Sequence, residues 1–347
     1  MNNCSPANLP IVQLSYFPFR LNFKSPFRIS HGIRSYTDVV YVKLEQENFT
    51  GWGEAALPPY LQETQKSVME YLTTFSRTFK SDSIDEWFEV LKYESKNMAA
   101  KAALDMALWS LRSQTEGKSI NELLGITQSQ FPLATYTIGV SDTAEMKLKI
   151  EEADKNGFEI FKLKLDGAND EGLVKTFRKL SSKRFLADVN QGWKNAEQVL
   201  RKIDFLKKEN CVLIEQPLKK DSLSEMKQLK QKSSLPLYAD ESCQGLSDIE
   251  KLRECFDGIN IKLMKCGGIT EAHQMILKAR ELEMQVLIGC MSESSAGCTA
   301  AAPLTALADY ADLDGPYLIS NDPFEGMKVA DGKIQINPLV SKGVIPL

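Results

Sequence analysis

Five ionisable residues in the middle of the chain each stand at the end of a short apolar segment. The segments are FKLK, RFLAD, CVLIE, LPLYAD and GINIK, and they end at Lys164, Asp188, Glu215, Asp240 and Lys262. The steps between these residues are 24, 27, 25 and 22, about the length of a strand, a helix and two loops. Successive strand–helix units would therefore bring all five charged groups to one end of a parallel sheet. Three carboxylates between two amines predict a metal site with a proton acceptor on either side.

The three acids supply only hard oxygen ligands. Asp188, Glu215 and Asp240 on adjacent strands suit Mg²⁺, which would keep water or substrate oxygens at its other positions. The alternative for any single one is a solvated acid that caps a helix. Three such acids in successive units favour the metal site.

The lysines predict acid–base chemistry. Lys162 and Lys164 point the same way on a strand, and two close, desolvated ammonium groups would make one of them a better base. A solvated edge strand is the alternative. Lys262 follows the metal triad in chain order, so in a closed barrel it would face the metal from the other side and could return a proton to the opposite face of a carbon acid. Lys265, beside the Gly267-Gly268 turn, is expected to be solvated.

Two further acids stand in the segment ADLDGP. Asp312 and Asp314 alternate at the position of an eighth strand, so both carboxylates should lie on one face. Such a pair attracts a cation such as an ammonium group. A surface turn and a second metal site are the alternatives.

The elements that must hold these residues alternate regularly from residue 129 to about 317. Short apolar strands and amphipathic helices follow one another over about seven units, which predicts an α/β fold, a (β/α)7-8 TIM-like barrel. Residues 1–128 are different: the segment 10–57 alternates as an antiparallel meander does, and helical segments follow it. We therefore expect an α+β capping domain over 1–128, joined by the C-terminal tail from about 318 to 347.

Composition excludes several classes of protein. The 347 residues carry a net charge of −4 with both signs interspersed, which does not favour nucleic acid or an anionic membrane as partners. The start, MNNCSPANLP, lacks the basic and apolar regions of a secretory signal. Seven scattered cysteines without a CxxC pair fit free thiols in the cytoplasm. With only two histidines, acid–base chemistry falls to other residue types.

Taken together, these motifs resemble the enolase superfamily, in its muconate-lactonizing-enzyme-like subgroup. The resemblance covers nearly the whole chain: GWGEA at 51–55, KLK at 162–164, DVNQGW at 188–193, EQP at 215–217, ADES at 239–242, NIKLMKCGG at 260–268 and GCMSES at 289–294. Within the subgroup, DLD at 312–314 is similar to the DxD of the dipeptide epimerases. The implied activity is inversion of the α-carbon of the C-terminal residue of a small dipeptide by two-base proton transfer.

The resemblance also implies roles. One Mg²⁺ per subunit would be bound by Asp188, Glu215 and Asp240, and Lys164 and Lys262 would be the two acid/base residues. Lys162 would contact the substrate carboxylate, and Asp312 and Asp314 would hold the dipeptide ammonium group. The positions implied to contact the peptide are Thr137, Cys290 and Ser292. Loops 24–36 and 52–61 of the first domain would cap the pocket.

One departure concerns the second residue of the dipeptide. Ala-Glu epimerases resemble this chain but carry an arginine in the first capping loop, where this sequence has Gly32, with His31 and Arg34 nearby but offset. The resemblance is therefore closer to the Ala-Ala-type members, with D-Ala-D/L-Ala or L-Ala-D/L-Xaa as substrates.

Other functions stay open at this point. An o-succinylbenzoate synthase, an N-succinylamino acid racemase or a cycloisomerase would use the same metal and lysines without an ammonium clamp. A Schiff-base aldolase barrel would use Lys164 or Lys262 as a nucleophile. A non-catalytic ligand-binding barrel would need no such charge set. Self-association as a homo-oligomer is also left open.

Overall fold

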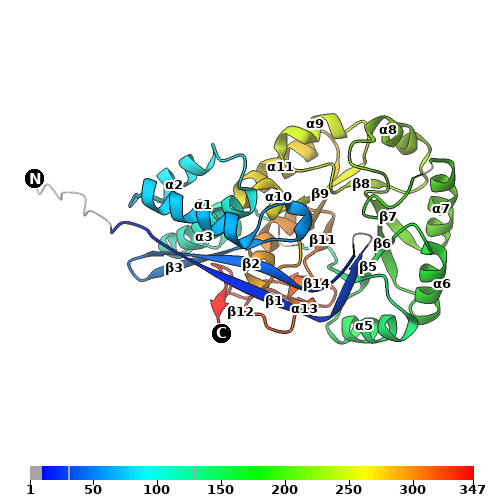
Figure 1. Cartoon of the computed structure of the whole chain (residues 1–347), viewed down its shortest axis with the longest axis horizontal. Helices are drawn as coiled ribbons and strands as arrows, with labels where there is room; N and C mark the ends of the chain where they lie inside the picture. Colours follow the sequence, from blue (N-terminus) through cyan, green and yellow to red (C-terminus); the bar gives the residue numbers. More distant parts are fainter. Residues whose placement is uncertain (1–9, 30–31, 129, 195) are drawn as a thin grey trace, which may run out of the picture.

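The structure is a computed structural model that describes residues 10–29, 32–128, 130–194 and 196–347. An antiparallel sheet with helices packs against a barrel of parallel strands (Figure 1). The segment MNNCSPANLP, which lacks the features of a secretory signal, lies outside the described residues apart from Pro10. Among the described residues, six cysteines carry free thiols. Within the same ranges, no helix is both long and apolar enough to cross a membrane.

The capping part, which comprises β1 to α4, begins with the predicted meander. Its three strands pair in the order β1-β2-β3 and are followed by helices. The elements are β1 (Gln13–Ile29), β2 (Gly32–Gln46), β3 (Phe49–Ala56), η1 (Pro59–Leu61), α1 (Gln65–Thr78), α2 (Ile84–Leu91), α3 (Met98–Glu116) and α4 (Ile120–Leu123). The β1–β2 hairpin reaches the barrel, because Lys24 forms an ion pair with Glu152 at 2.6 Å and Phe23 pairs with Ile319. The capping part is thereby placed over one end of the barrel.

The barrel contains eight parallel strands in chain order, which confirms the predicted fold class. They are β4 (Thr135–Ile138), β5 (Ile160–Lys164), β6 (Arg184–Asp188), β7 (Cys211–Glu215), β8 (Leu237–Ala239), β9 (Gly258–Lys262), β10 (Gln285–Gly289) and β11 (Tyr310–Asp312). A bridge between Ala134 and Ala311 joins the first and last strands and nearly closes the sheet.

Helices cover the outside of the barrel (Figure 1). They are α5 (Thr143–Lys155), α6 (Asp170–Leu180), α7 (Ala196–Lys208), α8 (Leu223–Lys232), η2 (Leu246–Asp248), α9 (Ile249–Leu252), α10 (Leu263–Cys266), α11 (Ile269–Glu281), α12 (Ser295–Ala301), η3 (Ala302–Leu307) and α13 (Gly315–Leu318). The amphipathic helices turn their apolar side to the strands, as Val174 and Phe177 of α6 do.

The C-terminal tail contacts both parts. It contains β12 (Phe324–Glu325), β13 (Lys328–Ala330), β14 (Lys333–Gln335) and β15 (Ile345–Pro346), which pair as β12–β15 and β13–β14. Lys333 bridges to Leu133 before β4. The carbonyl of Lys342 accepts a hydrogen bond from Ser110 Oγ of α3 at 3.0 Å. The tail thus fixes the capping part to the barrel.

An apolar layer fills the barrel interior on the side away from the carboxyl ends of the strands. Inward-facing residues of five strands form a separate buried cluster: Ile160, Leu186, Leu213, Tyr238 and Leu287. Because strand side chains alternate with period two, the next inward residue lies two positions further on, toward the carboxyl end of each strand. On four of these five strands that residue is charged, and this change positions the site: Lys162, Asp188, Glu215 and Asp240.

Candidate active site

The predicted metal ligands form one buried cluster at the carboxyl ends of β6, β7 and β8. Asp188, Glu215 and Asp240 each offer an oxygen, and these oxygens lie within 4.8 Å of one another. Asp188 and Glu215 are fully buried, and Asp240 is 3% exposed. Asp188 and Glu215 follow inward-facing Leu186 and Leu213 by two residues, and Asp240 follows Tyr238 in the same way. Three oxygen donors from adjacent strands make a hard-cation site.

The electrostatics of the triad fit a divalent cation. Burial and the charge of Asp188 raise the pKa of Glu215 to about 7. Burial opposes ionisation of Asp188 as well, but Lys164 and Lys162 outweigh it and lower the pKa of Asp188 to about 2. A dication would relieve the cost of a third buried negative charge at Glu215. The residues present therefore fit Mg²⁺.

Lys162 lies at the centre of this charge cluster. Its side chain is 1% exposed, and its Nζ lies 2.8 Å from Glu215 Oε2, 2.8 Å from Asp312 Oδ2 and 3.1 Å from Asp188 Oδ2. Burial disfavours the ammonium form, but Asp312, Glu215 and Asp188 outweigh burial and raise the pKa of Lys162 well above its usual value. Lys162 is therefore not the member of this pair that becomes the better base, because the carboxylates of three other strands surround it.

Lys164 and Lys262 flank the triad from the two neighbouring strands. Lys164, at the end of β5, places Nζ 2.5 Å from Asp188 Oδ2, and its side chain is 13% exposed. Lys262, at the end of β9, places Nζ 2.8 Å from Asp240 Oδ2. The structure therefore places one amine beside the first acid of the triad and the other beside the last.

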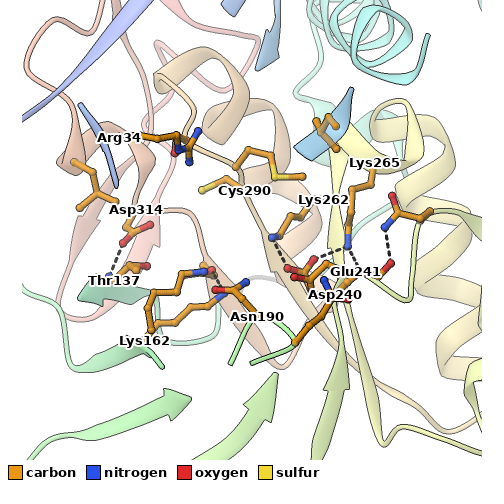
Figure 2. A pocket seen from close by; sticks show the side chains of 18 of the residues that line it. Arg34, Thr137, Lys162, Asn190, Asp240, Glu241, Lys262, Lys265, Cys290 and Asp314 are labelled. Atoms are coloured by element: carbon orange, nitrogen blue, oxygen red, sulfur yellow. Dashed lines mark hydrogen bonds and ion pairs between the residues drawn. The ribbon is translucent and has the colours of Figure 1, made fainter. Parts of the chain in front are cut away.

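Lys265 is buried rather than solvated, so this prediction is wrong. The one-turn helix α10 follows Lys262 directly and turns Lys265 back under the site. Its Nζ donates to the Asp240 carbonyl and Oδ1, both at 2.7 Å, and to the Asn260 carbonyl at 3.0 Å. Lys262 and Lys265 outweigh burial and hold the pKa of Asp240 well below its usual value. Figure 2 shows both amines converging on Asp240.

Asp312 and Asp314 lie at and just beyond the end of β11, both buried against β4. Asp312 Oδ2 accepts from Lys162 Nζ at 2.8 Å, and its Oδ1 accepts from Thr135 Oγ1. Asp314 Oδ2 accepts from the backbone N–H of Thr137. Burial and the charge of Asp312 raise the pKa of Asp314 to about 7. An arriving cation would therefore be stabilised most at Asp314.

A cavity of about 320 Å³ lies over this end of the barrel. Thr137, Cys290 and Ser292, to which the resemblance assigns contacts with the peptide, line it together with Lys162, Lys164, Asp240, Lys262, Asp312 and Asp314. From the capping part, Arg34 of β2 and Leu61 after β3 line it too (Figure 2). His31 lies outside the described residues. The cavity thus joins Asp240 of the triad and the lysines Lys162, Lys164 and Lys262 to a second acidic end, formed by Asp312 and Asp314.

Two family models match the chain. "Enolase C-terminal domain-like" matches residues 145–339, and "Mandelate racemase / muconate lactonizing enzyme, N-terminal domain" matches residues 12–125. The L-Ala-D/L-Glu epimerase of Bacteroides thetaiotaomicron is 39% identical, with 97% of this chain and 88% of that protein covered. The chain belongs to the enolase superfamily.

Two further relatives resemble the chain over nearly its whole length. The L-Ala-D/L-amino acid epimerase of a Maribacter species is 34% identical, over 96% of this chain and 99% of that protein. A solved dipeptide epimerase from Enterococcus faecalis, complexed with Mg and the dipeptide L-Leu-L-Tyr, is 28% identical with a TM-score of 0.87, over 97% of this chain and 99% of that one. The predicted enolase-superfamily membership and subgroup are therefore confirmed.

This enolase-superfamily cavity also has lining residues to which sequence reasoning gave no role. Asn190, Gln191, Lys220, Glu241 and Gln244 follow the ends of β6, β7 and β8. Asn190, Gln191 and Glu241 belong to the DVNQGW and ADES motifs, which carried the resemblance. Their position after a ligand-bearing strand was the available signal, since loops at the carboxyl ends of barrel strands form the site.

Proposed function

We propose that this chain is a magnesium-dependent dipeptide epimerase that inverts the α-carbon of the C-terminal residue. The observation that carries the proposal is the order of groups around the cavity. Lys164 on β5 and Lys262 on β9 stand on either side of the acids on β6, β7 and β8. Two amines on opposite sides of one bound carboxylate suit removal of a proton from one face and its return to the other.

The triad would hold the cofactor. Asp188, Glu215 and Asp240 would bind one Mg²⁺, which supplies a Lewis acid that favours negative charge on a bound carboxylate. Lys162 adds a permanent positive charge beside the same acids. It therefore stabilises the charge that develops when the α-proton leaves, more than it stabilises the substrate. Lys164 and Lys262 exchange the roles of acid and base for the two epimers.

The second acidic end selects a free ammonium group. Both oxygens of Asp312 already accept hydrogen bonds. In Asp314, burial and the charge of Asp312 destabilise the ionised carboxylate and raise its pKa, so a nearby cation would stabilise it more. We therefore assign the ammonium of the dipeptide to Asp314, with Asp312 beside it. An N-succinyl amino acid or a cycloisomerase substrate has no group for this end, which favours the epimerase over the lyases and racemases of the same fold.

Asp314 predicts how substrate binding depends on pH. Its pKa is raised to about 7, so the carboxyl takes up a proton as pH falls below 7 and loses its attraction for an ammonium. We expect KM for a dipeptide to rise by about tenfold per pH unit below 7 at saturating Mg²⁺. Initial rates between pH 5.5 and 8 measure this. An Asp314→Asn variant should have a high KM that changes little over the range, and a wild-type KM that is flat would contradict the assignment.

Arg34 bears on the second residue of the dipeptide. The sequence predicts a small neutral residue, as in Ala-Ala, because Arg34 is offset from the position that pairs with glutamate. Arg34 nevertheless lines the cavity, with its guanidinium carbon 5.7 Å from the ring centre of Phe23. L-Ala-L-Ala and L-Ala-L-Glu are therefore the two substrates to compare, within the general class L-Ala-D/L-Xaa.

The test of the proposal is α-proton exchange in D₂O with Mg²⁺, read as a mass shift over a panel of dipeptides. We expect both dipeptides to exchange and N-succinyl-L-alanine not to. Arg34→Met should lower kcat/KM for L-Ala-L-Glu by about tenfold, the worth of one ion pair in a partly buried site, and change that for L-Ala-L-Ala by less than about twofold. Equal loss for both would contradict a role for Arg34 in selectivity. No exchange with any dipeptide would refute the epimerase.

A further inference from the structure

A buried carboxylate of the capping part contacts the barrel part close to residues that line the cavity. Glu54, on β3 within the GWGEA motif, is 0% exposed, yet within the described residues no lysine or arginine donates a hydrogen bond to it. The site described above does not use it. A buried charge without a cationic partner is costly unless hydrogen bonds stabilise it. The residues that donate hydrogen bonds to Glu54 therefore indicate its role.

All the donors to Glu54 come from the segment that follows β10. The Ser294 N–H lies 3.1 Å from both carboxyl oxygens, Ser294 Oγ donates to Oε2 at 2.6 Å, and the Gly297 N–H donates to Oε2 at 3.0 Å. This segment begins with Cys290, Met291 and Ser292, which line the cavity. One side chain of the capping part therefore fixes the backbone directly after three cavity residues.

A second buried acid in this segment, Glu293, interacts electrostatically with both Glu54 and Lys262. Glu293 is 1% exposed and accepts from the Met291 N–H at 2.6 Å. Burial and the charge of Glu293 raise the pKa of Glu54 to about 8, and burial raises the pKa of Glu293 to about 7 despite the opposing charge of Lys262. The two acids and Lys262 therefore share one electrostatic environment.

The two glycines of GWGEA hold Glu54 rigidly. A Cβ at Gly51 would lie 1.9 Å from the Ala107 carbonyl, and a Cβ at Gly53 would lie 1.9 Å from the Ala103 carbonyl. Only glycine allows the backbone of β3 to lie directly on α3. Because side chains alternate along a strand, Glu54 projects from the opposite face, toward the barrel.

We propose that Glu54 is a positioning residue, a clamp through which the capping part holds the segment 290–297, and with it the wall of the cavity next to Lys262. The clamp acts through Ser294 and Gly297 and does not touch the substrate. The effect expected on KM rests on the proposed function, whereas the effect expected on amide hydrogen exchange in the segment 290–297 does not.

The experiment compares three variants by amide hydrogen exchange and by kinetics. Glu54→Met keeps the chain length and removes every acceptor, so deuterium uptake in 290–298 should rise, and KM for the dipeptide should rise by about tenfold, the equivalent of one lost charged hydrogen bond. Glu54→Gln keeps one carbonyl acceptor and should stay within about twofold of wild type in both measurements.

Asp105→Leu is the matched control. Asp105 of α3 is another buried capping-part carboxylate that accepts from a barrel helix, through the backbone N–H groups of Ile269 and Thr270. Its loss should raise exchange at 268–272 and leave both the segment 290–298 and KM within about twofold of wild type. If Asp105→Leu changes KM as much as Glu54→Met, general docking of the two parts explains the effect and the clamp is overturned.

Two further outcomes also decide the matter. Unchanged exchange in 290–298 for Glu54→Met refutes the clamp, whatever the kinetics. If Glu54→Met does not fold, Ser294→Ala removes one donor and should raise exchange in the same segment, and its failure to do so also refutes the clamp. If the wild type epimerises no dipeptide, the proposed function fails while the exchange data still decide the role of Glu54.

Discussion

Lys164→Ala and Lys262→Ala should each abolish epimerisation while leaving α-proton exchange with one epimer only. In the proposed mechanism each amine reaches the α-carbon from its own side, so a variant that keeps one base should still remove the proton on that side and return a deuteron to it. General acid–base groups contribute about 10²- to 10⁴-fold, so turnover between epimers should fall by at least that factor. Mass and chiral analysis of both epimers in D₂O with Mg²⁺ gives the two rates separately.

The matched control is Lys230→Ala. Lys230 lies on α8 and donates to the carbonyls of Arg253 and Phe256 at 2.7 Å, outside the cavity. Its loss removes a lysine from the barrel without touching the site, so it should leave epimerisation within about twofold of wild type. Full turnover in either cavity variant, or exchange of the same epimer in both, would end the two-base mechanism. A Schiff base with Lys164 or Lys262 would instead show as borohydride trapping and indifference to EDTA.

The barrel and the triad could be predicted because one local rule repeats. Five consecutive units, β5 to β9, each carry an ionisable residue at the end of a buried strand, and the spacing of 22 to 27 residues is that of one strand and one helix. Parallel strands place these ends at one rim without further information. Asp188, Glu215 and Asp240 therefore come together from sequence pattern alone.

The errors come from contacts between distant residues. Lys265 is close in sequence to a glycine turn, which suggested solvent, but the single turn of α10 directs it to Asp240 on another strand. The pattern KxK does not indicate which of Lys162 and Lys164 is the better base, because the contacts of Lys162 with Asp188, Glu215 and Asp312 come from three other strands. No local pattern reports which side chains arrive from the other strands.

The capping hairpin shows a second limit. Its register shifts between Asn22 and Phe27, where β1 takes five steps while β2 takes only two, from Tyr36 to Arg34. Such a bulge changes which side chains face the barrel. Counting along the sequence from Phe27 therefore gave Arg34 as offset, although its side chain lines the cavity.

Lys162→Met should destabilise the metal-free protein by roughly 3–5 kcal/mol, the cost of leaving buried charges without their partner. The ammonium of Lys162 is 1% exposed and lies within 3.1 Å of three carboxylates, all nearly or fully buried. Denaturant unfolding, under conditions where refolding is complete, measures the difference from wild type. The deficit should shrink with Mg²⁺, because a dication bound by Asp188, Glu215 and Asp240 restores positive charge to the same acids.

The deficit of Lys162→Met should also shrink at low pH. Without the ammonium, the buried carboxyls hold protons more tightly in the folded than in the unfolded chain, so the variant gains stability relative to wild type as pH falls from 8 to 5.5. Lys149→Met is the control: that side chain is 9% exposed but has one half-exposed carboxylate partner, Glu145 at 2.8 Å, and should cost about 1 kcal/mol at any of these pH values. Equal losses for the two variants, or a Lys162→Met deficit that neither Mg²⁺ nor acid reduces, would show that Lys162 does not balance the charge of the triad.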